Sequence, residues 1–121
     1  MTNRDAWNLY ERYLAGWRAV PDAEREQLTA AVVAADAHYK TRNHETGGRA
    51  TMIADMAAFQ QRFPGGHFAI GDVATHHDVA LLTWILVKAD GTEVARGHDQ
   101  LRVADGKIVD ILTFPPSVAQ P

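Results

Sequence analysis

The sequence contains no cysteine among its 121 residues. A disulfide framework, a thiolate nucleophile and a cysteine-based zinc site are therefore excluded. It also lacks an excess of positive charge, since 12 Lys and Arg residues stand against 15 Asp and Glu residues, and the cationic side chains are scattered. A formal net charge of −3 gives no field for holding nucleic acid, so a nucleic-acid partner is not expected.

Long hydrophobic runs and nucleotide-binding motifs are missing as well. No apolar stretch approaches the length of a membrane span, and the charged, aromatic start MTNRDAWNLYERYL is not expected to be a signal peptide. The stretches ETGG and FPGG have neither the lysine nor the glycine spacing of a phosphate-binding loop. These absences predict a cytoplasmic protein without membrane contact, metal or cofactor.

The composition is typical of one globular domain covering residues 1–121. Hydrophobic residues make up 46% and charged residues 22%, and no repeat or linker interrupts the chain. Pro21 and the Pro64–Gly66 stretch break an otherwise helical first half, and Asp22 is suited to be an N-cap. Apolar periodicity predicts helices at residues 3–20, 22–35 and 49–63, a short strand at 37–42 and a loop at 43–48.

Strand patterns fill the second half. Hairpin turns are expected at Asp90-Gly91 and Asp105-Gly106, and Pro115-Pro116 ends the last strand. The expected strands are residues 67–75, 79–87, 93–104 and 107–114. Three helices followed by hairpin-linked strands predict an α+β domain, with the helices packed on one face of a curved antiparallel sheet.

The strand at 79–87 is apolar on both faces, although only one face can meet the helices. An exposed apolar face favours association, so the sequence predicts a homodimer through the sheet. The alternative is a central strand that is buried on both faces within one chain.

An acidic residue interrupts the buried face of the strand at 93–104. Alternation puts Asp99 on the same face as the small or apolar residues Ala95, Gly97, Leu101 and Val103. An ionised carboxylate on such a face must be paired, hydrogen-bonded or neutral. Asp99 is therefore the first candidate for a functional residue, and the alternative is a purely structural hydrogen bond.

Three stretches carry a resemblance to a known family: RFPGGHF, HHDVALLTW and GHDQLRVADGKIVDILTF. Together with the element order, they resemble small SnoaL-like proteins of the nuclear-transport-factor-2-like superfamily, which includes ketosteroid isomerases and polyketide cyclases. The resemblance implies a cone-shaped half-barrel whose internal pocket receives Asp99. It further implies a cofactor-independent cyclase, isomerase or dehydratase acting on an apolar carbonyl compound. The alternative is a non-catalytic ligand-binding or assembly module of the same fold.

The resemblance also suggests roles for single residues. The oxyanion-hole aspartate and tyrosine of ketosteroid isomerases fall on Asp99 and Tyr13, and their general base falls on Thr41, which cannot serve as a base. In SnoaL-like cyclases a strand aspartate is the proposed acid–base group, and Asp99 resembles it in position. A replacement base would be His76 or His77, of which only one can enter the pocket, because neighbouring strand residues face opposite ways.

Large side chains supply the expected pocket walls, with ordinary core packing as the alternative. Aromatic residues that carry a polar atom suit a ligand site, and flexible thioethers suit a tolerant wall. The predicted lining is Trp17, Tyr39, Thr41, Met52, Met56, Phe59, Trp84, Leu101 and Phe114.

Overall fold

The structure is a computed structural model, and it describes residues 1–120. The first half of the chain is α1 (Asn3–Leu14), a 3-10 turn η1 (Ala15–Trp17), α2 (Asp22–Val32), β1 (Val33–Thr41), β2 (His44–Gly47) and α3 (Arg49–Arg62). The second half is β3 (His67–His76), β4 (Val79–Val87), β5 (Glu93–Ala104) and β6 (Lys107–Phe114). Within residues 1–120, no helix is long and apolar enough to cross a membrane.

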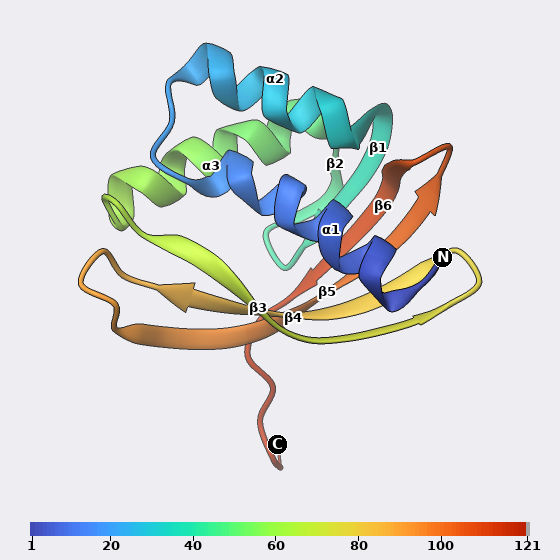
Figure 1. Cartoon of the computed structure of the whole chain (residues 1–121). Coiled ribbons are helices and arrows are strands. Elements are labelled where there is room, and N and C mark those ends of the chain that lie inside the picture. The colour runs from blue at the N-terminus through green and yellow to red at the C-terminus, as the bar shows by residue number, and fades with distance from the viewer. Residues whose placement is uncertain (121) are drawn as a thin grey trace.

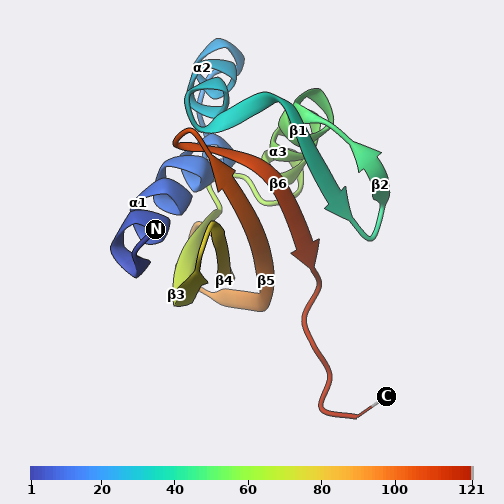
Figure 2. The ribbon, with the colours of Figure 1, turned by 90° about the vertical axis from the view of Figure 1, so that its right-hand side faces the viewer.

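The six strands form one curved, unclosed sheet in the order β2-β1-β6-β5-β4-β3. All three helices lie over the concave side of this sheet, whereas the C-terminal segment leaves in the opposite direction (Figures 1 and 2). The predicted α+β class with helices on one face is confirmed. The prediction of a purely antiparallel sheet is wrong, because β1 pairs with β6 in parallel and makes the sheet mixed.

Local sequence explains where the first two helices begin and end. Thr2 caps α1 through a reciprocal pair of hydrogen bonds with Asp5, an arrangement that satisfies otherwise unpaired backbone donors. The helix ends at Leu14 rather than at residue 20, and Gly16 lies in the following 3-10 turn, packed against α2 and α3. Its α-carbon is so close to Thr29 that an added Cβ would lie 2.9 Å from the Thr29 hydroxyl.

The second helix ends three residues earlier than predicted. Val32 and Val33 are β-branched and favour extended backbone, and β1 begins at Val33, so Ala35 belongs to a strand. Pro21, rather than Asp22, occupies the N-cap position of this helix. The predicted loop at 43–48 is also wrong in part, since β2 forms there and pairs antiparallel with β1.

A single buried cation fastens the first two helices together. Arg25 of α2 is only 4% exposed, and it donates hydrogen bonds to the carbonyl oxygens of Gly16 and Arg18 at 3.0 and 3.1 Å. Its remaining contact is with Asp22, which is exposed to water. Arg25 therefore fixes the turn that follows α1 and, with it, the position of Trp17.

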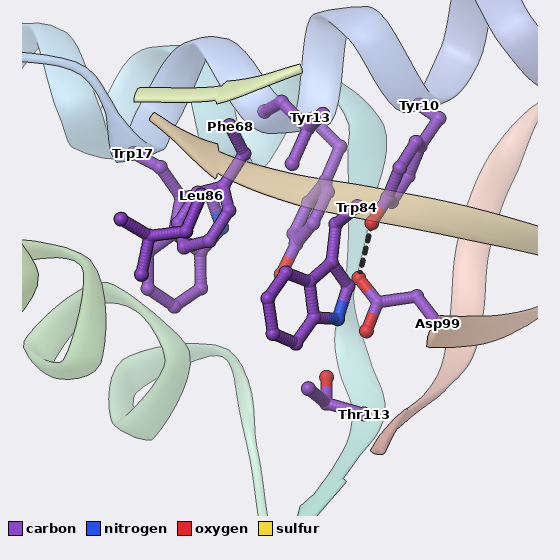
Figure 3. A pocket seen from close by; sticks show the side chains of 9 residues that line it. Tyr10, Tyr13, Trp17, Phe68, Trp84, Leu86, Asp99 and Thr113 are labelled. Carbon is purple, nitrogen blue, oxygen red and sulfur yellow. Dashed lines mark hydrogen bonds between the residues drawn. The ribbon is translucent and has the colours of Figure 1, made fainter. Parts of the chain in front are cut away.

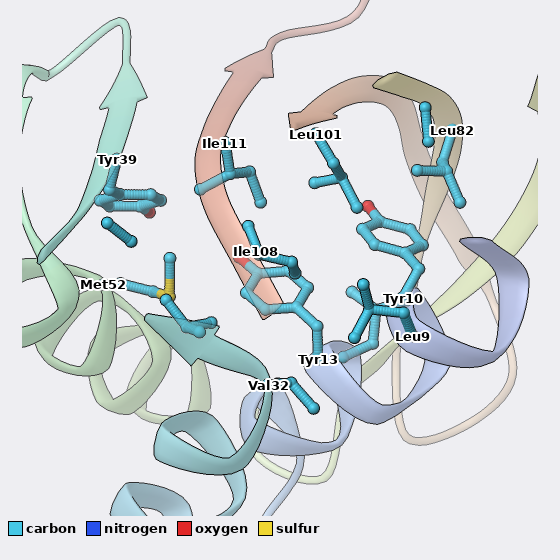
Figure 4. Packing of buried hydrophobic residues seen from close by; sticks show 14 of the residues in the cluster. Leu9, Tyr10, Tyr13, Val32, Tyr39, Met52, Leu82, Leu101, Ile108 and Ile111 are labelled. Atoms are coloured by element: carbon cyan, nitrogen blue, oxygen red, sulfur yellow. The ribbon is translucent and has the colours of Figure 1, made fainter. Parts of the chain in front are cut away.

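The hydrophobic core fills the space between the helices and the concave face of the sheet (Figure 4). Burial of this apolar surface is the main driving force for folding. The largest fully buried hydrophobic side chains are Tyr10, Tyr13, Met52, Met56, Leu82, Leu101, Ile108 and Ile111.

Candidate functional site

The middle of β5 directs one carboxyl group into the space beneath α1. Asp99 is paired in register with Leu82 of β4 and Thr113 of β6, and it is 4% exposed. The hydroxyl of Tyr10 donates a hydrogen bond of 2.6 Å to Oδ2 of Asp99. Tyr13 lies one helical turn further along α1, and its ring stacks on that of Tyr10 at a centroid distance of 5.7 Å.

Burial dominates the electrostatics of this group. It raises the pKa of Asp99 from an ordinary 3.8 to about 6, although the hydrogen bond from Tyr10 opposes the change. Burial and the neighbouring Asp99 charge raise the pKa values of both Tyr10 and Tyr13, so both phenols remain protonated. The Thr113 hydroxyl also faces the carboxyl, yet its geometry leaves Oδ1 of Asp99 without a hydrogen-bond partner.

A largely apolar cavity of about 110 Å³ adjoins this carboxyl (Figure 3). An engineered cavity of about 150 Å³ in another protein binds benzene, so this space is suited to a ligand of roughly one small ring. The side chains around it come from α1, η1 and the four strands β3 to β6. They are Tyr10, Tyr13, Leu14, Trp17, Phe68, Trp84, Leu86, Asp99 and Thr113.

Four of the residues singled out from the sequence meet at this cavity: Tyr13, Trp17, Trp84 and Asp99. The other predicted wall residues do not line it. Met52, Met56 and Leu101 belong to the buried core cluster, and Phe59 is buried against the rings of Trp17 and Phe68. These four residues therefore face the core without lining this cavity, and a ligand contact for them stays a prediction.

Phe114 is a clearer departure from the prediction, because its side chain is 48% exposed. A β-bulge shifts the β5–β6 register between Arg102 and Val103. Asp99 therefore pairs with Thr113, and Phe114 pairs with His98 on the convex face. A one-residue slip exchanges the two faces of a strand, and this slip gives the inward position to Thr113.

The two predicted base candidates, and Thr41 of the predicted lining, also lie elsewhere. His76 and His77 are both exposed at the turn between β3 and β4, and their Nδ1 atoms are 3.2 Å apart. Thr41 ends β1, where its hydroxyl accepts hydrogen bonds from the backbone N–H groups of Asn43 and His44. None of the three lines the cavity, so Asp99 is the carboxyl that the cavity presents.

A second polar cluster joins β1 and β2 to α3. The Tyr39 hydroxyl donates to Asp55 of α3 at 2.7 Å, and Nε2 of His44 lies 3.2 Å from the other oxygen of that carboxyl. Burial raises the pKa of Tyr39 above its ordinary value of 10. Tyr39 was predicted to line the pocket, but this hydrogen bond directs its hydroxyl to α3 instead. Within residues 1–120, no group of three or more His, Asp or Glu side chains is placed to hold a metal ion.

Sequence reasoning missed five residues of the cavity: Tyr10, Leu14, Phe68, Leu86 and Thr113. Tyr10 shares a helical face with Tyr13, so its spacing marked it as buried but not as the partner of Asp99. Leu86 follows from alternation, because it lies two residues after Trp84 on the same face of β4. The inward position of Thr113 depends on the β-bulge between β5 and β6, and no sequence pattern predicts this bulge.

The fold and the cavity together define an α+β domain with an apolar cavity between its helices and a curved sheet. The sequence matches the SnoaL-like domain family over residues 10–111, and the chain belongs to this family. Its predicted membership is thereby confirmed. This fold family includes isomerases and polyketide cyclases. No curated protein matches the sequence.

Solved structures share this fold. A candidate isomerase of the SnoaL-like family from Agrobacterium tumefaciens is 25% identical with a TM-score of 0.83, over 94% of this chain and 99% of that one. A candidate ketosteroid isomerase from Kribbella flavida is 20% identical with a TM-score of 0.69, over 98% and 83% of the two chains. A candidate polyketide cyclase from Sinorhizobium meliloti is 13% identical with a TM-score of 0.69, over 93% of this chain and 99% of that one. The last two likenesses show the fold alone.

Proposed function

We propose that the chain binds a small apolar carbonyl compound in this cavity and rearranges it without a cofactor. The reaction class would be a cyclisation, isomerisation or dehydration, with Asp99 as the acid–base group. The observation that carries the proposal is the environment of the Asp99 carboxyl. Its carboxyl is buried, one oxygen is fixed by Tyr10, and the other lacks a partner beside an apolar cavity.

The chemistry required of Asp99 is proton transfer next to a carbonyl group. A general acid–base group works best when its pKa lies near the operating pH, and burial brings the pKa of Asp99 to about 6. One carboxyl can then take a proton from carbon and return it to oxygen or to another carbon. Tyr13, which also lines the cavity, would remain protonated as a donor to the carbonyl oxygen.

The size of the cavity limits the substrate. Pockets for drug-sized ligands occupy roughly 300–1,000 Å³, whereas this cavity has about 110 Å³. A steroid-sized or other multi-ring compound would need the surrounding aromatic side chains to move. The proposal is therefore restricted to compounds of about one ring, such as a cyclohexanone.

The test is proton exchange at carbon. Cyclohexanone is incubated in D₂O with the wild-type protein, and NMR follows the loss of the protons next to its carbonyl. We expect exchange above the buffer rate for wild type, loss of that excess in Asp99→Asn, and no change in the control Asp72→Asn, whose carboxyl is exposed on β3. Equal exchange by wild type and Asp99→Asn would contradict the proposed role.

One observation favours a second candidate function, namely binding without turnover. His76, His77 and Thr41 all lie away from the cavity, so Asp99 has no second base beside it. Saturable binding of cyclohexanone by wild type, without any exchange above buffer, would identify a ligand-binding module. Exchange above buffer would exclude that alternative.

We also propose that the convex face of the sheet joins two copies of the chain. Leu81 of β4 and Phe114 of β6 lie on this face, and each is 48% exposed. Analytical ultracentrifugation should give the mass of a dimer for wild type and of a monomer for Leu81→Glu. Val94→Glu is the matched control, since Val94 is also 48% exposed but lies at the start of β5. A monomeric wild type at micromolar concentration would refute the proposal.

A further inference from the structure

The position of Trp84 depends on a glycine in the next strand. Trp84 of β4 pairs with Gly97 of β5, and its indole ring covers the place of a side chain at position 97. A Cβ added to Gly97 would lie only 2.1 Å from Cζ2 and 2.5 Å from Cε2 of this ring. Only glycine leaves room for the ring, so Gly97 allows the indole to lie across β5.

This placement brings the indole nitrogen close to the functional carboxyl. Cε2 is bonded to Nε1, and Asp99 follows Gly97 by two residues on the same face, about 7 Å further along the strand. Figure 3 shows the nitrogen of Trp84 on the side of the ring that faces Asp99. Both residues line the same cavity.

Both polar atoms at this point are buried and without a partner. Nε1 of Trp84 and Oδ1 of Asp99 are both buried, and neither makes a hydrogen bond to another protein atom. Buried polar groups in folded proteins are normally hydrogen-bonded, because an unmade bond costs free energy. Two such atoms from neighbouring strands, beside one cavity, point to a missing polar atom that both would contact.

We propose that Trp84 is a specificity-determining residue whose indole N–H, together with Asp99, binds the oxygen atom of a one-ring carbonyl or enolate ligand. The inference rests on the proposed function, because it concerns the same cavity and the same carboxyl. It adds a second contact to the ligand oxygen and explains why Gly97 accommodates the indole at this position.

The chemistry of the two groups selects the ligand atom. An indole nitrogen can only donate a hydrogen bond. Asp99 becomes neutral once it has taken the proton from carbon; because Tyr10 already donates to Oδ2, that proton can reside on Oδ1 and be donated from there. Two donors then face the oxygen of the enolate, which has free lone pairs to accept both hydrogen bonds. A methyl group in the same place would leave both donors unpaired.

The experiment compares phenol, which mimics an enolate, with toluene, in which a methyl group replaces the hydroxyl. The ¹⁵N-labelled full-length chain is titrated at pH 5 with each compound while NMR records the indole N–H signals of its three tryptophans. We expect phenol, but not toluene, to shift the Trp84 indole signal downfield. This readout on the wild-type protein needs no variant that could fail to fold.

Variants then measure the contribution of the N–H group. The preference for phenol over toluene, as a ratio of dissociation constants, should fall about tenfold in Trp84→Phe, which corresponds to about 1.4 kcal/mol. Trp7→Phe is the matched control, because it removes an indole that does not line this cavity. There, both affinities and the preference for phenol should remain as in wild type.

The outcomes separate the two proposals. In one case wild type prefers phenol, Asp99→Asn abolishes this preference, Trp84→Phe retains it, and phenol does not shift the Trp84 indole signal of wild type. The Trp84 inference is then overturned and the proposed function stands. If wild type binds toluene and phenol equally, or binds neither, both are overturned. A phenol-specific indole shift with loss of preference in Trp84→Phe supports both.

Discussion

The buried carboxyl of Asp99 should make the folding free energy depend on pH in a characteristic way. Burial raises its pKa from 3.8 to about 6 in the folded protein. Between these two values the folded chain holds a proton that the unfolded chain has released. The stabilisation is therefore complete below about pH 3.8 and is lost as the pH rises through about 6. The difference corresponds to about 3 kcal/mol, since each pH unit is worth about 1.4 kcal/mol.

The substitution Asp99→Asn removes this dependence, because an amide does not ionise. At pH 7.5 wild type carries the cost of a buried, ionised carboxylate and the variant does not. The variant should therefore gain up to about 3 kcal/mol relative to wild type between pH 4 and pH 7.5. Its amide can still accept the hydrogen bond from Tyr10, so its fold should be kept.

The assay is urea denaturation, followed by circular dichroism, at half-unit steps from pH 4 to pH 8. The quantity of interest is the difference in unfolding free energy between wild type and Asp99→Asn at each pH. The control is Asp72→Asn, which removes an exposed carboxylate from the same sheet. If the curves of wild type and Asp99→Asn run parallel over the whole range, the reasoning about the buried carboxyl is refuted.

Three further substitutions test other contacts. Gly97→Ala should destabilise the fold by about 1–3 kcal/mol in urea denaturation, because the added Cβ clashes with Trp84 and with a backbone oxygen 2.5 Å away that cannot rotate aside; unchanged stability would contradict the tight contact. Arg25→Met should lower the free energy of unfolding by about 1–3 kcal/mol, because two carbonyl oxygens lose their donor. Asp22→Asn, at the exposed end of the same ion pair, should change the melting temperature little. Equal effects of the two substitutions would contradict the role of Arg25 in holding the turn after α1. Tyr10→Phe should raise the pKa of Asp99 further, because the hydrogen bond from Tyr10 lowers that pKa. An NMR titration in which Asp99 of the variant has the same midpoint as in wild type would disprove this expectation.

Much of the fold follows from local patterns in the sequence. The helical spacing of apolar residues predicted three helices, and the turns at Asp90-Gly91 and Asp105-Gly106 predicted the hairpins that link β4, β5 and β6. Strand alternation put Asp99 on the inner face of β5, where the structure has it. These features were predictable because each depends on residues only a few positions apart.

Other features depend on how distant segments meet. Tyr10 and Tyr13 lie on one face of α1, and the sequence does not distinguish which hydroxyl will reach Asp99, 89 positions beyond Tyr10. The packing of α1 on the sheet brings the hydroxyl of Tyr10 to that carboxyl. The parallel pairing of β1 with β6 likewise joins the first and the last strand of the sequence, which no local pattern encodes.

The sequence by itself determined that an acidic side chain would face the helices from the middle of a strand, because strand alternation is a property of the backbone. Only the tertiary structure decided what surrounds that acid. The bulge near Val103 turns Thr113 inward and Phe114 outward, and the contact with Gly97 lays the Trp84 ring beside Asp99. Register and close packing arise from the balance of many contacts between distant segments, so they exist only once the chain has folded.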